Sequence, residues 1–166
     1  MSLPSHQQCY ALWNKYEMPE NIQVHTRAVV EVADAVAAAI EKKRHAVNKE
    51  LVNRGALLHD IAKIISIKKK REVRHTKVGA QIIEQEGFPK KLADIVCNHG
   101  LDEFSDALTL EEQIVNYADK RVMHDTIVSL KERMDDLKVR YPAAAEVVEK
   151  KLPLYEEFEK KYGINF

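Results

Sequence analysis

Apolar residues recur along almost the whole chain at intervals of three, four or seven residues, which is the spacing of one face of an α-helix. After Pro19 this pattern marks a long helix, whose apolar face carries Ile22, Val29, Val32, Val36 and Ile40. Alternation of the kind that a β-strand shows never lasts more than a few residues, and no sequence repeat has the period of a solenoid. The pattern predicts an all-α fold.

Capping residues and glycines mark the predicted ends of the helices in the first half of the chain. Ser5 is expected to cap a short helix that ends near Tyr16, and Asn48 to open the helix that follows the long one. A further helix is predicted over residues 75–86, with Gly87 as its stop.

The second half of the chain continues the helical pattern. Pro89 suits the first turn of a helix that Gly100 would end. Thr109 and Glu112 have the spacing of a capping box, which predicts a helix from there through Val122. Two more helices are predicted, over about 126–138 and 142–162.

Composition narrows the class of protein. The 166 residues are 45% hydrophobic and 31% charged, as in ordinary globular domains, and no low-complexity linker divides them. Lys plus Arg and Asp plus Glu both number 26, which argues against general nucleic-acid binding. No apolar run approaches the roughly 20 residues that cross a bilayer, and the first 20 residues do not resemble a signal peptide. Since only Cys9 and Cys97 could pair, no disulfide framework is expected, and the predicted location is the cytoplasm.

Ionisable residues occur on helix faces that should otherwise be apolar. His25 lies four residues before Val29, on the apolar face of the long helix. The same placement recurs on four further predicted helices, at His59 with Asp60 beside it, His75, His99 and Asp119. A single such histidine is usually a core residue with its hydrogen bonds satisfied. Five helices that each direct an imidazole or carboxylate inward indicate a shared site.

Metal binding explains why such groups would be buried together, because burial of an unpaired ionisable group is costly. Four imidazoles and two carboxylates suit Fe, Mn, Zn, Co or Ni better than Ca or Mg. Six protein ligands are too many for one catalytic ion with open positions, so two ions are expected. The spacing suggests one ion between His25, His59, Asp60 and Asp119, and a second held by His75 and His99 with Asp60 as the bridge.

The order of these residues and their local contexts resemble the HD-domain metal-dependent phosphohydrolases. Residues 57–63 (LLHDIAK) resemble the LLHDIGK segment of that family, with Ala62 where many relatives have Gly. Residues 74–80 (RHTKVGA) are similar to its H-x-x-x-G-A helix start, and residues 118–120 (ADK) to its A-D-K ending. The resemblance implies a single HD-domain helical bundle over 1–166. Its core would span about 18–125, with a short N-terminal helix and C-terminal helices at 126–162 packed on it.

The resemblance also implies an activity. It suggests hydrolysis of phosphate ester or anhydride bonds in a small anionic, nucleotide-like substrate by a hydroxide that bridges two divalent transition-metal ions, with iron placed first. Asp60 and Lys63 would be the catalytic residues, Lys63 by contact with substrate phosphate. The six-ligand version resembles symmetrical diadenosine tetraphosphate hydrolases and cyclic dinucleotide phosphodiesterases. The GYP signature of the latter group is absent, which argues against that substrate.

Other interpretations stay open at this point. Some HD-fold proteins with a similar ligand set are di-iron oxygenases, and a third alternative is a non-catalytic metal-binding or regulatory module. Residues 63–77 carry seven basic residues against Glu72, and this run is either a solvated loop or an attractor of anionic substrates beside the site. Neither a membrane nor a nucleic acid is expected as a partner. The apolar face of the last helix would pack on the domain body or on a second subunit. His6, His45 and His124 are expected at the surface.

Overall fold

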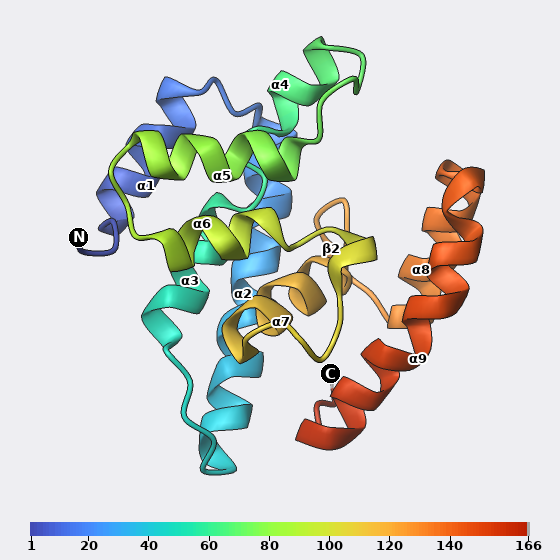
Figure 1. Cartoon of the computed structure of the whole chain (residues 1–166). Helices are drawn as coiled ribbons and strands as arrows, with labels where there is room; N and C mark the ends of the chain where they lie inside the picture. The colour runs from blue at the N-terminus through green and yellow to red at the C-terminus, as the bar shows by residue number, and fades with distance from the viewer. Residues whose placement is uncertain (166) are drawn as a thin grey trace.

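Helices form nearly all of the regular structure in the computed structural model, which describes residues 1–165 (Figure 1). The α-helices are α1 (His6–Lys15), α2 (Glu20–Lys42), α3 (Lys49–Leu58), α4 (Lys63–Lys68), α5 (His75–Gln85), α6 (Lys90–Cys97), α7 (Leu110–Asp119), α8 (Leu130–Arg140) and α9 (Ala145–Tyr162). Two short 3₁₀ helices, η1 (Leu101–Glu103) and η2 (Pro142–Ala144), and one small hairpin of β1 (Val122–Met123) and β2 (Thr126–Ile127) complete the described part. The prediction of an all-α fold is confirmed.

Several helix ends lie where the local sequence signals put them. Ser5 caps α1 and accepts a hydrogen bond from the backbone of Gln8, while Asn48 caps α3. Thr109 and Glu112 form the expected capping box at the start of α7. Each of these side chains satisfies a backbone N–H that the first turn of a helix leaves without a partner.

Other boundaries differ from the prediction. The helix that starts at Thr109 ends at Asp119, and Val122 lies in β1 because the chain turns back there into a hairpin. For the same reason Thr126 belongs to β2, and α8 begins only at Leu130. Ser129 and Glu132 form a capping box at the start of α8, which the sequence analysis did not identify.

The predicted boundaries of α5 and α6 are only partly confirmed. Gly87 follows α5 in a left-handed conformation, at φ 79°, as a stop signal would. Pro89, however, is the N-cap of α6 rather than part of its first turn, and α6 ends at Cys97, before Gly100. Residues 63–68 of the basic run form α4 rather than a loop.

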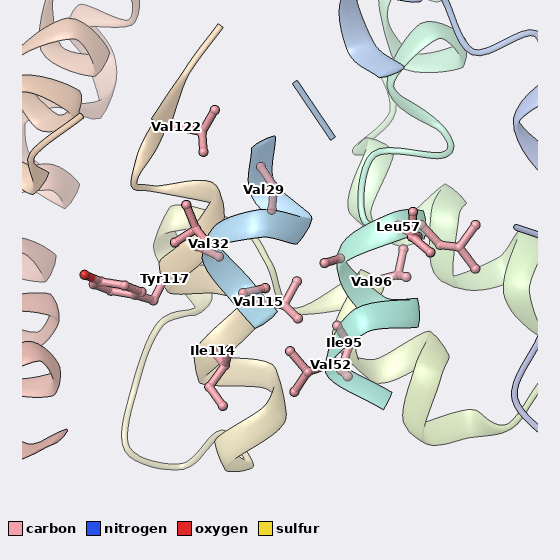
Figure 2. Close-up of a cluster of buried hydrophobic side chains, with 14 of the residues drawn as sticks. Val29, Val32, Val52, Leu57, Ile95, Val96, Ile114, Val115, Tyr117 and Val122 are labelled. Carbon is pink, nitrogen blue, oxygen red and sulfur yellow. The ribbon is translucent and has the colours of Figure 1, made fainter. Parts of the chain in front are cut away.

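The core is built around α2, which runs through the middle of the bundle (Figure 1). One side of α2 faces α3 and the other faces α7, and Val29 and Val32 of α2 lie near Val115 of α7 in the buried cluster that Figure 2 shows. Helices α3 and α6 approach closely at Gly55, where an added Cβ would lie 2.6 Å from a methyl carbon of Ile95. This packing aligns the ends of α3, α5, α6 and α7 toward one region.

Helices α8 and α9 lie side by side at one flank of the bundle (Figure 1). Tyr155 of α9 is fully buried and stacks on Phe104 with ring centroids 3.9 Å apart. Phe158, one turn further along α9, packs edge-on against the same Phe104 ring. Among residues 1–165 no helix is both long enough and apolar enough to cross a membrane.

Candidate metal centre

Six ionisable residues from separate parts of the bundle meet at one point. His25 projects from α2, His59 and Asp60 follow directly after α3, and Asp119 is the last residue of α7. His75 begins α5, and His99 comes two residues after α6. These are the six residues that the sequence selected as metal ligands, and the structure places them in one cluster. Their role as ligands stays a prediction.

Asp60 lies at the centre of this cluster, and its two oxygens face different pairs of histidines. Oδ2 is 3.5 Å from Nε2 of His59 and 4.0 Å from Nε2 of His25. Oδ1 is 3.3 Å from Nε2 of His75 and 3.5 Å from Nε2 of His99. The carboxylate therefore separates the cluster into two halves, and each half receives one oxygen.

Asp119 belongs to only one half. Its Oδ1 is 3.0 Å from Nε2 of His25 and 3.6 Å from Nε2 of His59. One ring nitrogen or carboxylate oxygen from each of His25, His59 and Asp60 lies within 4.8 Å of those of the other two, and the same holds for Asp60, His75 and His99. Each group has the donor types and the spacing that a transition-metal ion needs.

Backbone carbonyls orient three of the four imidazoles. Nδ1 of His59 donates to the carbonyl of Ala56, and Nδ1 of His99 donates to that of Val96, each over 2.7 Å. His25 uses Nδ1 in the same way, toward the carbonyl of His124 at 2.7 Å. A hydrogen bond at Nδ1 leaves Nε2 to face the cluster, which is how metal-binding histidines are commonly held.

The surroundings of Nε2 of His59 show whether the cluster fits a metal ion. The atom is buried, and within residues 1–165 it has no hydrogen-bond partner. Its neighbours are the carboxylates of Asp60 and Asp119, at 3.5 and 3.6 Å. In the neutral imidazole a lone pair of Nε2 faces these two carboxylates, which is unfavourable unless a proton or a metal ion lies between them. The residues present therefore fit a bound metal ion.

The two carboxyl groups of the cluster are held in the charged form that binds metals. Burial raises the pKa of Asp60, but the charges of Lys63 and His59 outweigh burial and hold that pKa well below its usual range. The pKa of Asp119 also lies well below its usual range, because the charge of Lys120 and a hydrogen bond with His25 outweigh the effect of burial. Both side chains are therefore carboxylates at neutral pH.

Two of the histidines differ in their affinity for a proton. Burial lowers the pKa of His99 to about 4, so its imidazole is neutral at pH 7. At His59 burial also lowers the pKa, but Asp60 and Asp119 raise it by more, with a net rise. The pocket around Nε2 of His59 thus attracts positive charge, which a metal ion would supply in place of a proton.

Two cavities open onto the cluster from different sides. One, of about 520 Å³, is lined by His25 and by His124 of the hairpin turn. The other, of about 380 Å³, is lined by His75 and His99. Three cationic side chains line both cavities, namely Lys63, Arg133 and Arg140. Both cavities therefore place these cations close to the cluster.

Two of these cations come from α8, which sequence reasoning had not connected with the site. Arg133 lies three residues after Leu130 and four before Leu137, on the apolar face of its helix. That placement is the signal that selected the histidines, and it would have selected Arg133. His124 is exposed, as predicted, yet its backbone carbonyl orients His25, a role that no side-chain pattern can reveal.

The basic run over 63–77 divides into two parts. Arg71 and Arg74 line the cavity beside His75, so this part of the run does flank the site. Lys68 instead pairs with Glu17 at 3.1 Å, away from both cavities. The run is therefore partly a site wall and partly surface.

The segment that carries the six clustered residues is similar to known proteins. Residues 22–123 match the model of the family described as HD domain. An uncharacterized protein of Methanocaldococcus jannaschii is 36% identical over 129 residues, which are 66% of this chain and 74% of that protein. A tRNA (cytidine(56)-2'-O)-methyltransferase of Thermoplasma volcanium is 32% identical over 149 residues, 81% of this chain and 41% of that enzyme.

A ribonuclease Y of Fervidobacterium nodosum is also similar, at 32% identity over 101 residues, 60% of this chain and 18% of the ribonuclease. The chain thus spans less than half the length of the methyltransferase and less than a fifth of the ribonuclease. No solved structure matches it.

Proposed function

Because this chain belongs to the HD domain family, whose members bind divalent metals and are generally hydrolases, we propose that it hydrolyses phosphate ester or anhydride bonds of a small, nucleotide-like substrate. The observation that carries the proposal is the position of Asp60, whose two oxygens each face a separate pair of histidine nitrogens. Two divalent ions bound there would activate a water molecule and neutralise charge on the phosphoryl oxygens.

The distances would divide the six residues between two ions. His25, His59 and Asp119 would hold one ion, and His75 and His99 the other, with Asp60 common to both. Imidazole and carboxylate donors suit Fe, Mn, Zn, Co or Ni. In this assignment Asp60 would position both ions, while the hydrogen bonds at Nδ1 of His25, His59 and His99 would keep the ligand nitrogens in place.

Lys63 is placed to act on the substrate. Its Nζ is 3.1 Å from Oδ2 of Asp60, and its side chain lines both cavities. The carboxylate of Asp60 raises the pKa of Lys63 against the effect of burial, so the side chain is an ammonium group at neutral pH. It would contact a phosphoryl oxygen whose negative charge grows in the transition state.

Replacement of Lys63 by alanine should therefore lower kcat by about 10–100-fold and change KM much less, because the lost contact strengthens in the transition state. Steady-state kinetics at saturating substrate measure this split. Lys69→Ala is the control, since Lys69 is exposed and lines neither cavity. A Lys63→Ala enzyme with an unchanged kcat and a raised KM would contradict the assignment.

Metal binding itself should be visible as thermal stabilisation. A ligand that binds only the folded state, at 100 times its Kd, adds about 2.7 kcal/mol, or about 5–10 °C in Tm for a chain of this size. We expect this rise when Mn²⁺ is added to metal-free protein. His59→Ala should abolish most of the rise, and the exposed His45→Ala should retain it. Equal rises in both variants would argue against the cluster as the metal site.

A substrate panel tests the activity. Protein reconstituted separately with Fe²⁺, Mn²⁺, Zn²⁺, Co²⁺ and Ni²⁺ is incubated with nucleoside mono-, di- and triphosphates, diadenosine tetraphosphate, a cyclic dinucleotide and a short RNA, and products are separated by chromatography. Turnover of a free nucleotide supports the proposal. Two relatives are named for enzymes of RNA, so cleavage of the RNA alone would replace the proposed substrate with a nucleic acid. Oxygen consumption without phosphate release would instead identify an oxygenase.

A further inference from the structure

Helix α8 lies beyond residues 22–123, the part that matches the HD domain family, yet it supplies side chains to both cavities. Arg133 and Arg140 are seven residues apart, which is two helical turns, so they lie on one face of α8. Both line the cavity beside His25 and the cavity beside His75. They form part of the wall that the two cavities share.

One carboxylate on the same helix holds both arginines. Oδ2 of Asp136 is 2.5 Å from Nη1 of Arg133 and 3.2 Å from Nε of Arg140. Among residues 1–165, Asp136 is the one carboxylate within ion-pair distance of either guanidinium. Two cations that share one anion leave one positive charge uncompensated, and it lies where the cavities meet.

Arg133 has a buried hydrogen-bond donor without an acceptor among residues 1–165. The residue is only 9% exposed, and its Nε is buried without a hydrogen-bond partner in the described part of the chain. Charged residues are rarely buried to this extent unless they are fully paired. A donor that is desolvated and left without an acceptor is unfavourable, and an oxyanion at this position would satisfy it.

The two cavities differ in charge. The cavity beside His75 contains Arg71, Arg74 and Lys120 in addition to the three shared cations, against Asp119 as its one acidic lining residue in the described chain. Arg74 is paired with Asp102 and Glu103, and Lys120 with Asp119, so Arg71 and the two arginines of α8 supply the excess positive charge. The cavity beside His25 contains acidic as well as basic side chains, with Glu20 and Asp125 at its wall. A chain of phosphates would therefore be drawn into the cavity beside His75.

We propose that Arg133 and Arg140 form a clamp for a second phosphoryl group, adjacent to the one that is cleaved, so that the substrates carry two or more linked phosphoryl groups. The inference rests on the proposed function for the position of the cleaved group, beside Asp60 and Lys63. Guanidinium groups bind phosphate oxygens through paired hydrogen bonds, and Asp136 keeps both arginines directed toward the cavities. The clamp would select polyphosphorylated compounds over monophosphates.

Calorimetric titration with inorganic tripolyphosphate and with orthophosphate tests the clamp without any need for hydrolysis. The titrations use metal-free protein in the presence of a chelator, and are repeated after Mn²⁺ loading and removal of free metal. Wild-type protein should bind tripolyphosphate at least about tenfold more tightly than orthophosphate. Arg140→Gln should lower the affinity for tripolyphosphate by about tenfold or more and leave that for orthophosphate nearly unchanged.

Lys131→Gln is the matched control, because it removes one positive charge from the exposed side of the same helix and should change neither affinity. Arg140 is itself exposed, so its variant should fold, whereas Arg133→Gln changes a buried residue. Arg133→Lys, which keeps the charge but not the paired hydrogen bonds, gives a second measurement at that position. It should retain the fold and lose most of the preference for tripolyphosphate.

These experiments distinguish a failure of the clamp from a failure of the proposed hydrolase function. If Arg140→Gln and Lys131→Gln bind tripolyphosphate as wild type does, the clamp is wrong, whatever the enzyme hydrolyses. If the metal-loaded wild-type protein hydrolyses no substrate but its binding of tripolyphosphate still depends on Arg140, the proposed function fails and the clamp remains. Where hydrolysis occurs, Arg140→Gln should raise KM for nucleoside triphosphates by about tenfold and raise KM for a phosphate monoester by much less, because the monoester lacks the second phosphoryl group.

Discussion

Replacement of Asp60 by asparagine should lower kcat by at least about 10³-fold, which corresponds to about 4 kcal/mol in activation free energy. Asparagine has nearly the same shape as aspartate, so packing is kept while one of the two oxygens is lost. In the structure each oxygen of Asp60 faces its own pair of histidines, and no other side chain in the described cluster reaches both halves in this way. The variant should also retain less metal, which elemental analysis of the purified protein measures.

Loss of a single histidine should be less severe. His75 contacts only the half of the cluster that faces Oδ1 of Asp60, and a water molecule could occupy part of its place. We therefore expect His75→Ala to retain more activity than Asp60→Asn. Asp135→Asn, which neutralises an exposed carboxylate, should behave as wild type. Equal turnover in the Asp60 and His75 variants would contradict the bridging role of Asp60.

Replacement of Tyr155 by alanine should lower the free energy of unfolding by about 3–5 kcal/mol, and Tm by on the order of 10 °C. The ring is fully buried and stacks on Phe104, so alanine would leave a large cavity between α9 and η1. Its hydroxyl also donates to Oδ1 of Asn116 over 2.6 Å. Urea unfolding followed by circular dichroism measures the change in free energy.

Tyr155 is also connected through Asn116 to the residues beside His99 of the candidate metal centre. Nδ2 of Asn116 donates to the carbonyls of Asn98 and Gly100, at 2.7 and 2.8 Å, which are the residues on either side of His99. Tyr155→Phe removes only the hydroxyl and should cost about 1–2 kcal/mol. A Tyr155→Ala protein that loses less than about 1 kcal/mol would indicate that α9 contributes little to the cooperative fold.

The C-terminal helices are fastened to the bundle by polar contacts as well. The hydroxyl of Tyr117 donates to Glu159 at 2.7 Å, and Nζ of Lys151 donates to the carbonyl of Phe104 at 2.8 Å. These contacts explain how α8, the partner of α9, is held beside the cluster. The prediction of one domain over 1–166 stays a prediction, and a single unfolding transition in wild type and in Tyr155→Phe would support it.

Sequence reasoning was most successful where the physics is local. The capping box at Thr109 and the stop at Gly87 depend on atoms within about four residues, so the pattern alone located them. The same holds for His25 on α2 and Asp119 on α7 as polar residues on apolar faces, because helical periodicity determines which side of a helix a residue occupies. His99 was selected by the same pattern, but it lies two residues beyond the end of α6. Signals with a weaker local basis failed, as at Val122, where pairing with Ile127 replaced the expected helix.

The sequence by itself therefore determined the fold class and selected the six residues that meet in the cluster, since these follow from periodicity and from the cost of burying charge. Only the tertiary structure decided that the two oxygens of Asp60 face different histidine pairs, that the carbonyl of His124 orients His25, and that Arg133 reaches both cavities. These features depend on how α2, the hairpin and α8 pack against one another across as many as about a hundred residues of chain, and no helical repeat encodes such distances.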